Sequence, residues 1–134
     1  MIHEIRDEQG RLMHCVVKEV ETGRRNISSD DQFIQCATLR LDAGTTFRAH
    51  QHRWKYFDNS PEIAQESWVV IRGSVKVFFY DTKGVLLEEH IIKTGEASFT
   101  YQGGHNYLIL EDDTFVFEYK TGPYHGQEAD KVFL

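Results

Sequence analysis

The stretch SWVVIRGSVKVFFYDTKGVLLEEHII, residues 67 to 92, contains three consecutive segments that favour β-structure. Residues 67–73 are rich in β-branched side chains and end at Gly73, and residues 74–81 alternate between apolar and polar side chains. After the turn sequence TKG, residues 85–92 form the third segment. Short strands separated by glycine-containing turns at this spacing are typical of a β-sandwich or a β-barrel.

The rest of the chain repeats this pattern. Further strand-like segments occupy residues 33–41, 97–101, 106–111 and 114–119. No apolar stripe of helical periodicity and useful length is present, and the best candidate for a short helix or an irregular loop is residues 53–65. The sequence therefore predicts an all-β fold: one domain, residues 1–134, built as a closed or nearly closed antiparallel barrel of the double-sheet jelly-roll type.

The composition points away from nucleic acids and membranes as partners. The chain has 15 basic and 21 acidic side chains, a net charge of −6, whereas binding to a phosphate backbone normally requires a basic surface. No apolar run approaches the length of a membrane span. The N-terminal sequence MIHEIRDEQGR has no apolar signal core, so we expect a cytoplasmic protein. There Cys15 and Cys36 should be reduced, and their apolar neighbours predict two small buried residues.

Two histidines follow a glycine turn in the segment GTTFRAHQHRW, residues 44 to 54. Strand side chains two positions apart point to the same face, so the imidazoles of His50 and His52 should converge. Glu66 begins a later strand, and His105 begins another one behind a double glycine. A buried polar group without a partner costs on the order of 1–3 kcal/mol, and a divalent cation is a natural common partner for imidazole and carboxylate. We therefore predict a metal site formed by these four side chains, with a hydrogen-bonded polar cluster as the alternative.

The donor types limit the metal to divalent transition ions. Zinc takes such ligands tetrahedrally, whereas iron, nickel, cobalt or manganese is more often octahedral and keeps open positions. One glutamate and three neutral histidines leave a divalent ion with a formal charge of +1, which favours an anionic or enediolate-like ligand. The sequence does not select among these five metals.

The same residues resemble the first sequence motif of the cupins. That motif is a glycine, five residues, His-x-His, a short spacer, a glutamate, six residues and a second glycine. Gly44, five residues and the HQH of positions 50–52 match its first half, and Glu66, six residues and Gly73 match its second half. The spacer has thirteen residues here instead of the usual three or four. Insertion in a surface loop costs little, because closure entropy grows slowly with loop length.

The second cupin motif is matched only in part. Gly95 and five residues precede Tyr101, which stands where the family has proline, and Gly103 follows in the expected place. His105 arrives one residue early, and Asn106 is not at the asparagine position of the family. The second motif is therefore a weaker match than the first.

The resemblance covers about residues 33 to 120. It implies a six- to eight-stranded cupin barrel, often dimeric, with a metal held inside by the four side chains of the predicted site: His50, His52, Glu66 and His105. The sequences VKVFFYD, GGHNYLILED and EYKTGPYHGQEADKVFL further resemble small stand-alone cupins associated with surface-polysaccharide and sugar-nucleotide biosynthesis. That subgroup has no well-defined reaction to transfer.

Two tyrosines are the candidate catalytic residues. Tyr107 shares a strand face with His105 by two-residue spacing, and Tyr101 closes the preceding strand-like segment. Both are equally consistent with ordinary filling of the barrel.

Strand alternation also predicts the surroundings of the site. Trp68 and Val70 share a face with Glu66, so we expect them to form an apolar wall inside the barrel. The segment 53–65 carries three aromatic residues and is either a lid over the barrel mouth or a plain insertion.

Three functions remain open at this stage. The first is a metal-dependent cupin that acts on a small polar metabolite such as a sugar derivative. The others are a non-catalytic ligand-binding barrel and a metal-free sugar-nucleotide isomerase or epimerase, with a histidine as base and a tyrosine as acid. We expect a homodimer in each case, because the apolar segment 11–20 is suited to pairing with a second copy.

Overall fold

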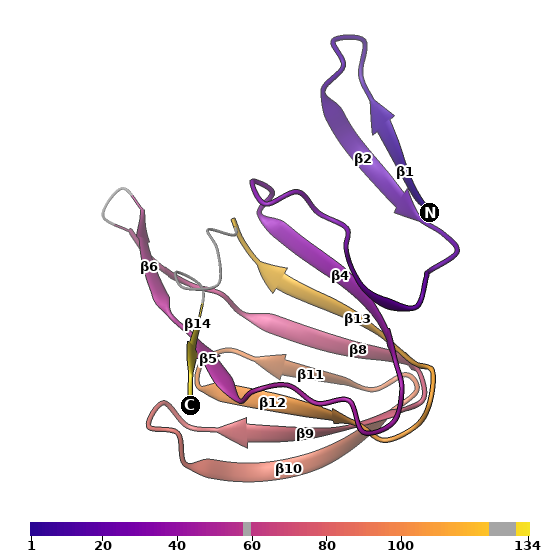
Figure 1. Cartoon of the computed structure of the whole chain (residues 1–134). Helices are drawn as coiled ribbons and strands as arrows, with labels where there is room; N and C mark the ends of the chain where they lie inside the picture. The colour runs from indigo at the N-terminus through magenta and orange to yellow at the C-terminus, as the bar shows by residue number, and fades with distance from the viewer. Residues whose placement is uncertain (58–59, 124–130) are drawn as a thin grey trace.

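The computed structural model describes residues 1–57, 60–123 and 131–134 and contains only β-strands and connections (Figure 1). No helix in this described part of the chain is long and apolar enough to span a membrane. The strands are β1 (Ile2–Arg6), β2 (Leu12–Val17), β3 (Gly23–Asn26), β4 (Ile34–Leu41), β5 (His50–His52), β6 (Trp54–Phe57), β7 (Ser60–Ile63), β8 (Glu66–Arg72), β9 (Ser74–Tyr80), β10 (Leu86–Lys93), β11 (Ala97–Thr100), β12 (Gly104–Ile109), β13 (Thr114–Thr121) and β14 (Lys131–Phe133).

Two five-stranded antiparallel sheets form the body of the molecule. One has the order β10-β9-β12-β5-β14, and the other has the order β11-β8-β13-β4-β3. Strands that are distant in sequence are neighbours in both sheets, and Figure 1 shows the sheets as two layers that curve around a common interior. This arrangement confirms the predicted all-β double-sheet jelly roll.

The strand pairing places apolar and polar inward-facing side chains at different positions along the barrel. On one sheet Val116 lies between Val70 and Leu39, and all three are buried. Together with apolar residues of the facing sheet they belong to the hydrophobic core of the barrel. At the other end of β8, Glu66 pairs with Thr100 on one side and Lys120 on the other. The interior is therefore apolar at one end and polar at the other, and the polar end holds the predicted site.

The prediction of a short helix or an irregular loop over residues 53–65 is wrong. Residues Trp54–Phe57 and Ser60–Ile63 pair as an antiparallel hairpin, β6–β7, while residues 58–59 lie outside the described part. The insertion satisfies its backbone hydrogen-bonding groups by pairing with itself, which permits a long spacer between the two halves of the first motif without any change in the main sheets.

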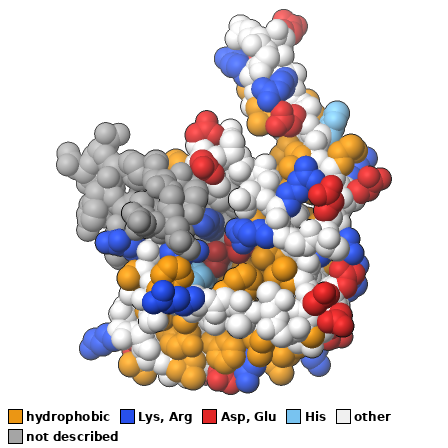
Figure 2. Space-filling view, in the orientation of Figure 1, with side chains coloured by type: hydrophobic (Ala, Val, Ile, Leu, Met, Phe, Trp, Pro, Cys, Tyr) orange, Lys and Arg blue, Asp and Glu red, His pale blue; other side chains and the backbone are white. Residues whose placement is uncertain are grey.

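A second hairpin, β1–β2, extends away from the barrel at the N-terminus (Figures 1 and 2). Its two strands pair only with each other among the described strands. Cys15 on β2 is consequently exposed, and Cys36 on β4 is half-buried, so the prediction of two buried cysteines is wrong for Cys15. Neither thiol forms a disulfide in the described part of the chain.

Candidate metal centre

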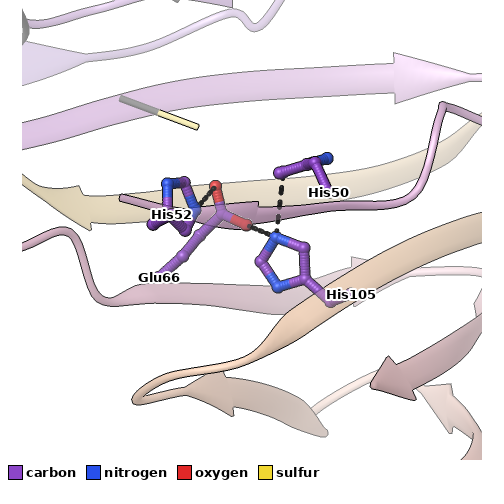
Figure 3. A group of neighbouring side chains, drawn as sticks. All are labelled: His50, His52, Glu66 and His105. Carbon is purple, nitrogen blue, oxygen red and sulfur yellow. Dashed lines mark hydrogen bonds and ion pairs between the residues drawn. The ribbon is translucent and has the colours of Figure 1, made fainter. Parts of the chain in front are cut away.

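Four side chains from three strands meet at the polar end of the barrel (Figure 3). His50 and His52 come from β5, Glu66 is the first residue of β8, and His105 lies on β12 directly opposite His50. All four are buried, and His105 is 0% exposed. Each offers one ligand atom, and these atoms lie within 4.8 Å of one another. The structure thus brings together all four residues of the predicted metal site.

The two shortest distances between ligand atoms both involve Nε2 of His105. This atom lies 3.2 Å from Nε2 of His50 and 2.7 Å from Oε2 of Glu66. Nε2 of His52 lies 3.8 Å from the other carboxylate oxygen, Oε1. Ligand atoms that share one ion at about 2.1 Å are separated from one another by about 3 Å, so the spacing is close to that of a common coordination sphere.

Hydrogen bonds at the outer ring nitrogens orient two of the imidazoles. Nδ1 of His50 lies 3.0 Å from the backbone carbonyl oxygen of Arg48, to which it must donate because a carbonyl only accepts. Its Nε2 therefore carries a lone pair directed at His105. Nδ1 of His105 lies 2.8 Å from the hydroxyl of Thr100. Such outer contacts fix the tautomer and the ring orientation of metal-binding histidines.

The protonation states suit a metal ion. Burial and the nearby His105 lower the pKa of His50 to about 4, so this imidazole is neutral at pH 7. Burial alone would raise the pKa of Glu66, but His105 and His52 outweigh it and hold the pKa well below its usual range. Neutral imidazole and ionised carboxylate are the forms that bind metals. The inward-facing lone pair of His50 and the ionised carboxylate of Glu66 are therefore in the forms that bind a divalent cation.

Tyr107 stands next to this cluster. Its hydroxyl lies 3.4 Å from Oε2 of Glu66 and 3.4 Å from Nδ1 of His105. Its ring stacks on Trp68, with 3.7 Å between ring centroids, and burial together with the Glu66 charge raises its pKa well above the usual value. Trp68 and Val70 are buried beside it, which confirms the predicted apolar wall.

Tyr101 does not reach the cluster. Strand β11 ends at Thr100, whose side chain points inward with that of Ser98, and alternation turns Tyr101 outward, where it is 66% exposed. The side chain that does face His105 from this segment is Thr100, which sequence reasoning missed. The parity of Ser98 and Thr100 relative to Glu66 is the signal that could have found it.

A cavity of about 310 Å³ adjoins the cluster. His50 and Glu66 line it, together with the aromatic side chains of Phe47, Trp68 and Tyr107. Three basic residues that sequence reasoning missed also line it: Arg24, Lys120 and Lys131. They belong to separate strands, and only the sheet order places them together.

No family model matches the sequence, and no curated protein matches it. Several solved structures do match. KdgF from Halomonas sp. has 18% identity and a TM-score of 0.57, over 78% of this chain and 80% of that chain. The capsular polysaccharide assembling protein CapF from Staphylococcus aureus has 19% identity and a TM-score of 0.64, over 83% of this chain and 31% of that chain. Oxalate decarboxylase from Bacillus subtilis has 17% identity and a TM-score of 0.62, over 86% of this chain and 29% of that chain.

At these identities the likeness shows the fold alone, which is the double-sheet jelly roll that the sequence predicted. The chain spans 31% of CapF and 29% of oxalate decarboxylase, so it corresponds to about one third of each of those proteins. The activity of a protein three times as long does not transfer with the shape of one part, because one fold hosts many activities.

Proposed function

We propose that this protein is a metal-binding cupin that acts on, or binds, a small polar metabolite. The observation that carries the proposal is the convergence of three imidazoles and one carboxylate, all buried, on one point at the polar end of the barrel. The candidate ions are Fe, Zn, Ni, Co and Mn, because imidazole and carboxylate ligands suit all of them.

The ion and the protein side chains would have different chemical roles. A bound ion would supply a Lewis acid that polarises an oxygen of the ligand. Glu66 and the three histidines would hold the ion, and Thr100 orients His105 through the 2.8 Å contact at Nδ1. Tyr107 has a raised pKa, so it keeps its proton and is the candidate residue for donating a hydrogen bond or a proton inside the cavity.

A sugar derivative from polysaccharide biosynthesis is the proposed class of metabolite. The support is the likeness to CapF, a capsular polysaccharide assembling protein, together with the sequence cues in VKVFFYD and GGHNYLILED. The cavity is polar near the histidines and aromatic along one wall, a combination that suits a polyol ring.

Elemental analysis of protein purified without added metal tests this function. We expect about one transition-metal ion per chain, and a melting temperature that falls on addition of chelator because ligand binding stabilises the native state. His50→Ala and His105→Ala should lose the metal, and Glu66→Gln should weaken its binding. His90→Ala is the matched control, because His90 is exposed on β10 and contacts Glu88 instead. Wild-type protein with no stoichiometric metal, and with melting indifferent to chelator, would reject the proposal.

The contact of Tyr107 with His105 favours a second candidate function. A histidine and a tyrosine at hydrogen-bonding range are the pair that a metal-free sugar-nucleotide isomerase or epimerase needs as base and acid. Turnover of candidate sugar nucleotides by metal-free protein would support it. Binding of the same compounds without turnover, in metal-loaded and metal-free protein alike, would identify a non-catalytic ligand-binding barrel.

We also propose a cytoplasmic homodimer with a small-molecule ligand as its other partner. The net charge of −6 supports a ligand other than nucleic acid or a membrane. The dimer is supported by an apolar groove of about 380 Å³ on the outer face of the β11-β8-β13-β4-β3 sheet, where Phe33, Ile34 and Phe99 are exposed. The β1–β2 hairpin, which is marginal on its own, is the segment of a second copy that we place there.

A further inference from the structure

Basic side chains flank the metal centre on both sheets. Lys120 on β13 lies directly opposite Glu66 in the strand pairing, and Lys131 on β14 lies directly opposite His52. Directly paired residues have Cβ atoms about 5 Å apart. Both lysines line the 310 Å³ cavity together with His50 and Glu66, so they stand beside the centre.

A third basic residue, Arg24, is fixed in the wall of the same cavity. Its guanidinium donates to both carboxylate oxygens of Glu118, at 2.7 and 3.2 Å. Glu118 also accepts a 2.9 Å hydrogen bond from Nε1 of Trp68. Glu118 is therefore engaged with Arg24 and Trp68, and its charge is balanced within that group.

The charges that line the cavity leave it positive once a divalent ion is bound. The lining has three basic and three acidic residues, so its net charge without an ion is zero. They are Arg24, Lys120 and Lys131, and Asp30, Glu66 and Glu118. A divalent ion adds two positive charges and gives a net charge of +2. The cavity volume lies at the low end of the range for small-molecule sites, and the aromatic rings of Trp68 and Tyr107 form one wall.

The face of the molecule drawn in Figure 2 agrees with this combination of charged and aromatic side chains. Figure 2 shows a hollow in which Lys or Arg, Asp or Glu and His side chains gather next to hydrophobic ones. A ligand in such a place meets charge on one side and an apolar surface on the other.

We infer that the cavity binds a sugar-sized metabolite that carries an anionic group, a carboxylate or a phosphate, and that Lys120 and Lys131 hold that group beside the metal centre. The inference rests on the proposed function because it counts the charge of a bound metal ion. The two lysines contribute positive charge whether or not the ion is bound. Charge-assisted hydrogen bonds from the lysines would orient the anionic end, and the aromatic wall would cover the rest of the ligand.

A matched set of probes tests the inference on the full 134-residue chain. NMR titrations with D-glucuronate, D-glucose 6-phosphate and D-glucose compare one ring with a carboxylate, with a phosphate and with neither. We expect at least one anionic probe to bind ten times more tightly than glucose, and the tighter of the two identifies the anionic group. Glucose affinity equal to that of both anionic probes, or no binding of any of the three, would overturn the inference.

Charge-removing variants assign the effect to the two lysines. Lys120→Met and Lys131→Met should each weaken binding of the preferred anionic probe about tenfold and leave glucose unaffected. Lys76→Met is the control of equal charge change, because Lys76 pairs with Glu89 and does not line the cavity. An equal loss in the control would show a general charge effect and contradict the assignment.

The metal content of each sample separates the two proposals. Anion preference that persists in protein without metal would support the inference while the proposed metal function fails. Metal-loaded protein without anion preference would support the proposed function and reject the inference.

Discussion

Nε2 of His50 and Nε2 of His105 lie 3.2 Å apart, although the residues are 55 positions apart in the chain. Antiparallel pairing of β5 with β12 sets the two residues directly opposite each other. The backbone bond from His50 Nδ1 to Arg48 then turns the His50 lone pair toward His105. Two such nitrogens are favourable neighbours when a proton or a cation lies between them, and this relationship underlies the predictions on metal binding and on pH.

Removal of the Thr100 hydroxyl should weaken metal binding without removing any ligand. Thr100→Val deletes the 2.8 Å contact at Nδ1 of His105, and we expect a 10–100-fold loss of metal affinity, as for other outer-shell changes. Competition titration with a chelator measures it. Thr100→Ser keeps the hydroxyl and should restore the affinity. Equal losses in both variants would contradict a hydrogen-bonding role.

Metal-free protein should lose stability as the pH falls from about 6.5 to about 4. The pKa of His50 is lowered from 6.5 to about 4, so within this window the unfolded chain binds a proton that the folded chain rejects. The free energy of unfolding should therefore rise with pH across the window, by on the order of 3 kcal/mol from this residue. The lowered pKa of Glu66 also makes the folded state more stable at higher pH. Its contribution to the free energy of unfolding is present above the pKa of Glu66 in the unfolded chain and is lost on acidification.

Urea unfolding of metal-free protein at a series of pH values measures this slope. His50→Gln removes the titrating imidazole and should flatten the curve between pH 4 and 6.5, the range set by the shifted and ordinary pKa values of His50. A variant curve as steep as that of wild type would assign the slope to other groups.

Gly73→Ala should destabilise the fold more than Gly95→Ala. Both glycines have positive φ values, +95° and +85°, so both alanines carry the strain of a left-handed backbone, about 1–2 kcal/mol. A Cβ at Gly73 would also collide with Thr114, whereas a Cβ at Gly95 meets nothing. Thermal melting should show the larger loss for Gly73→Ala, and equal losses would contradict the steric account of this motif glycine.

Phe99→Asp should convert the proposed dimer to a monomer. Phe99 is 60% exposed in the apolar groove, and a buried unpaired carboxylate in an interface is costly. Leu87→Asp is the control, because Leu87 is 61% exposed on β10 and lies outside the groove. Light scattering at micromolar protein should show a dimer for wild type and for the control. A wild-type mass that stays monomeric at every concentration would reject the dimer.

The fold could be predicted from the sequence because alternation and glycine turns are local signals. The two-residue spacing of His50 and His52, and that of Glu66, Trp68 and Val70, places these side chains on inward faces as expected. The same rule places Tyr101 outward, but the sequence analysis did not carry the strand parity from Ser98 and Thr100 to this residue.

Other features depend on which strands become neighbours, and no local pattern encodes this. Lys120 and Lys131 reach the site through the pairing of β13 with β8 and of β14 with β5. The exposure of Cys15 follows from a hairpin that pairs with no other described strand, although its sequence is apolar. The β6–β7 hairpin did have a signal, since Asp58 and Asn59 are turn-forming residues between two short segments.

Anomalous X-ray scattering from crystals of metal-loaded protein tests the central claim most directly. Data collected at the absorption edge of the ion that copurifies should give one strong peak per chain, lying between Nε2 of His50, Nε2 of His105, His52 and Glu66. The peak should vanish in crystals of His105→Ala. A peak at another place in the chain, or an intact peak in that variant, would contradict the assignment of these four side chains as the metal centre.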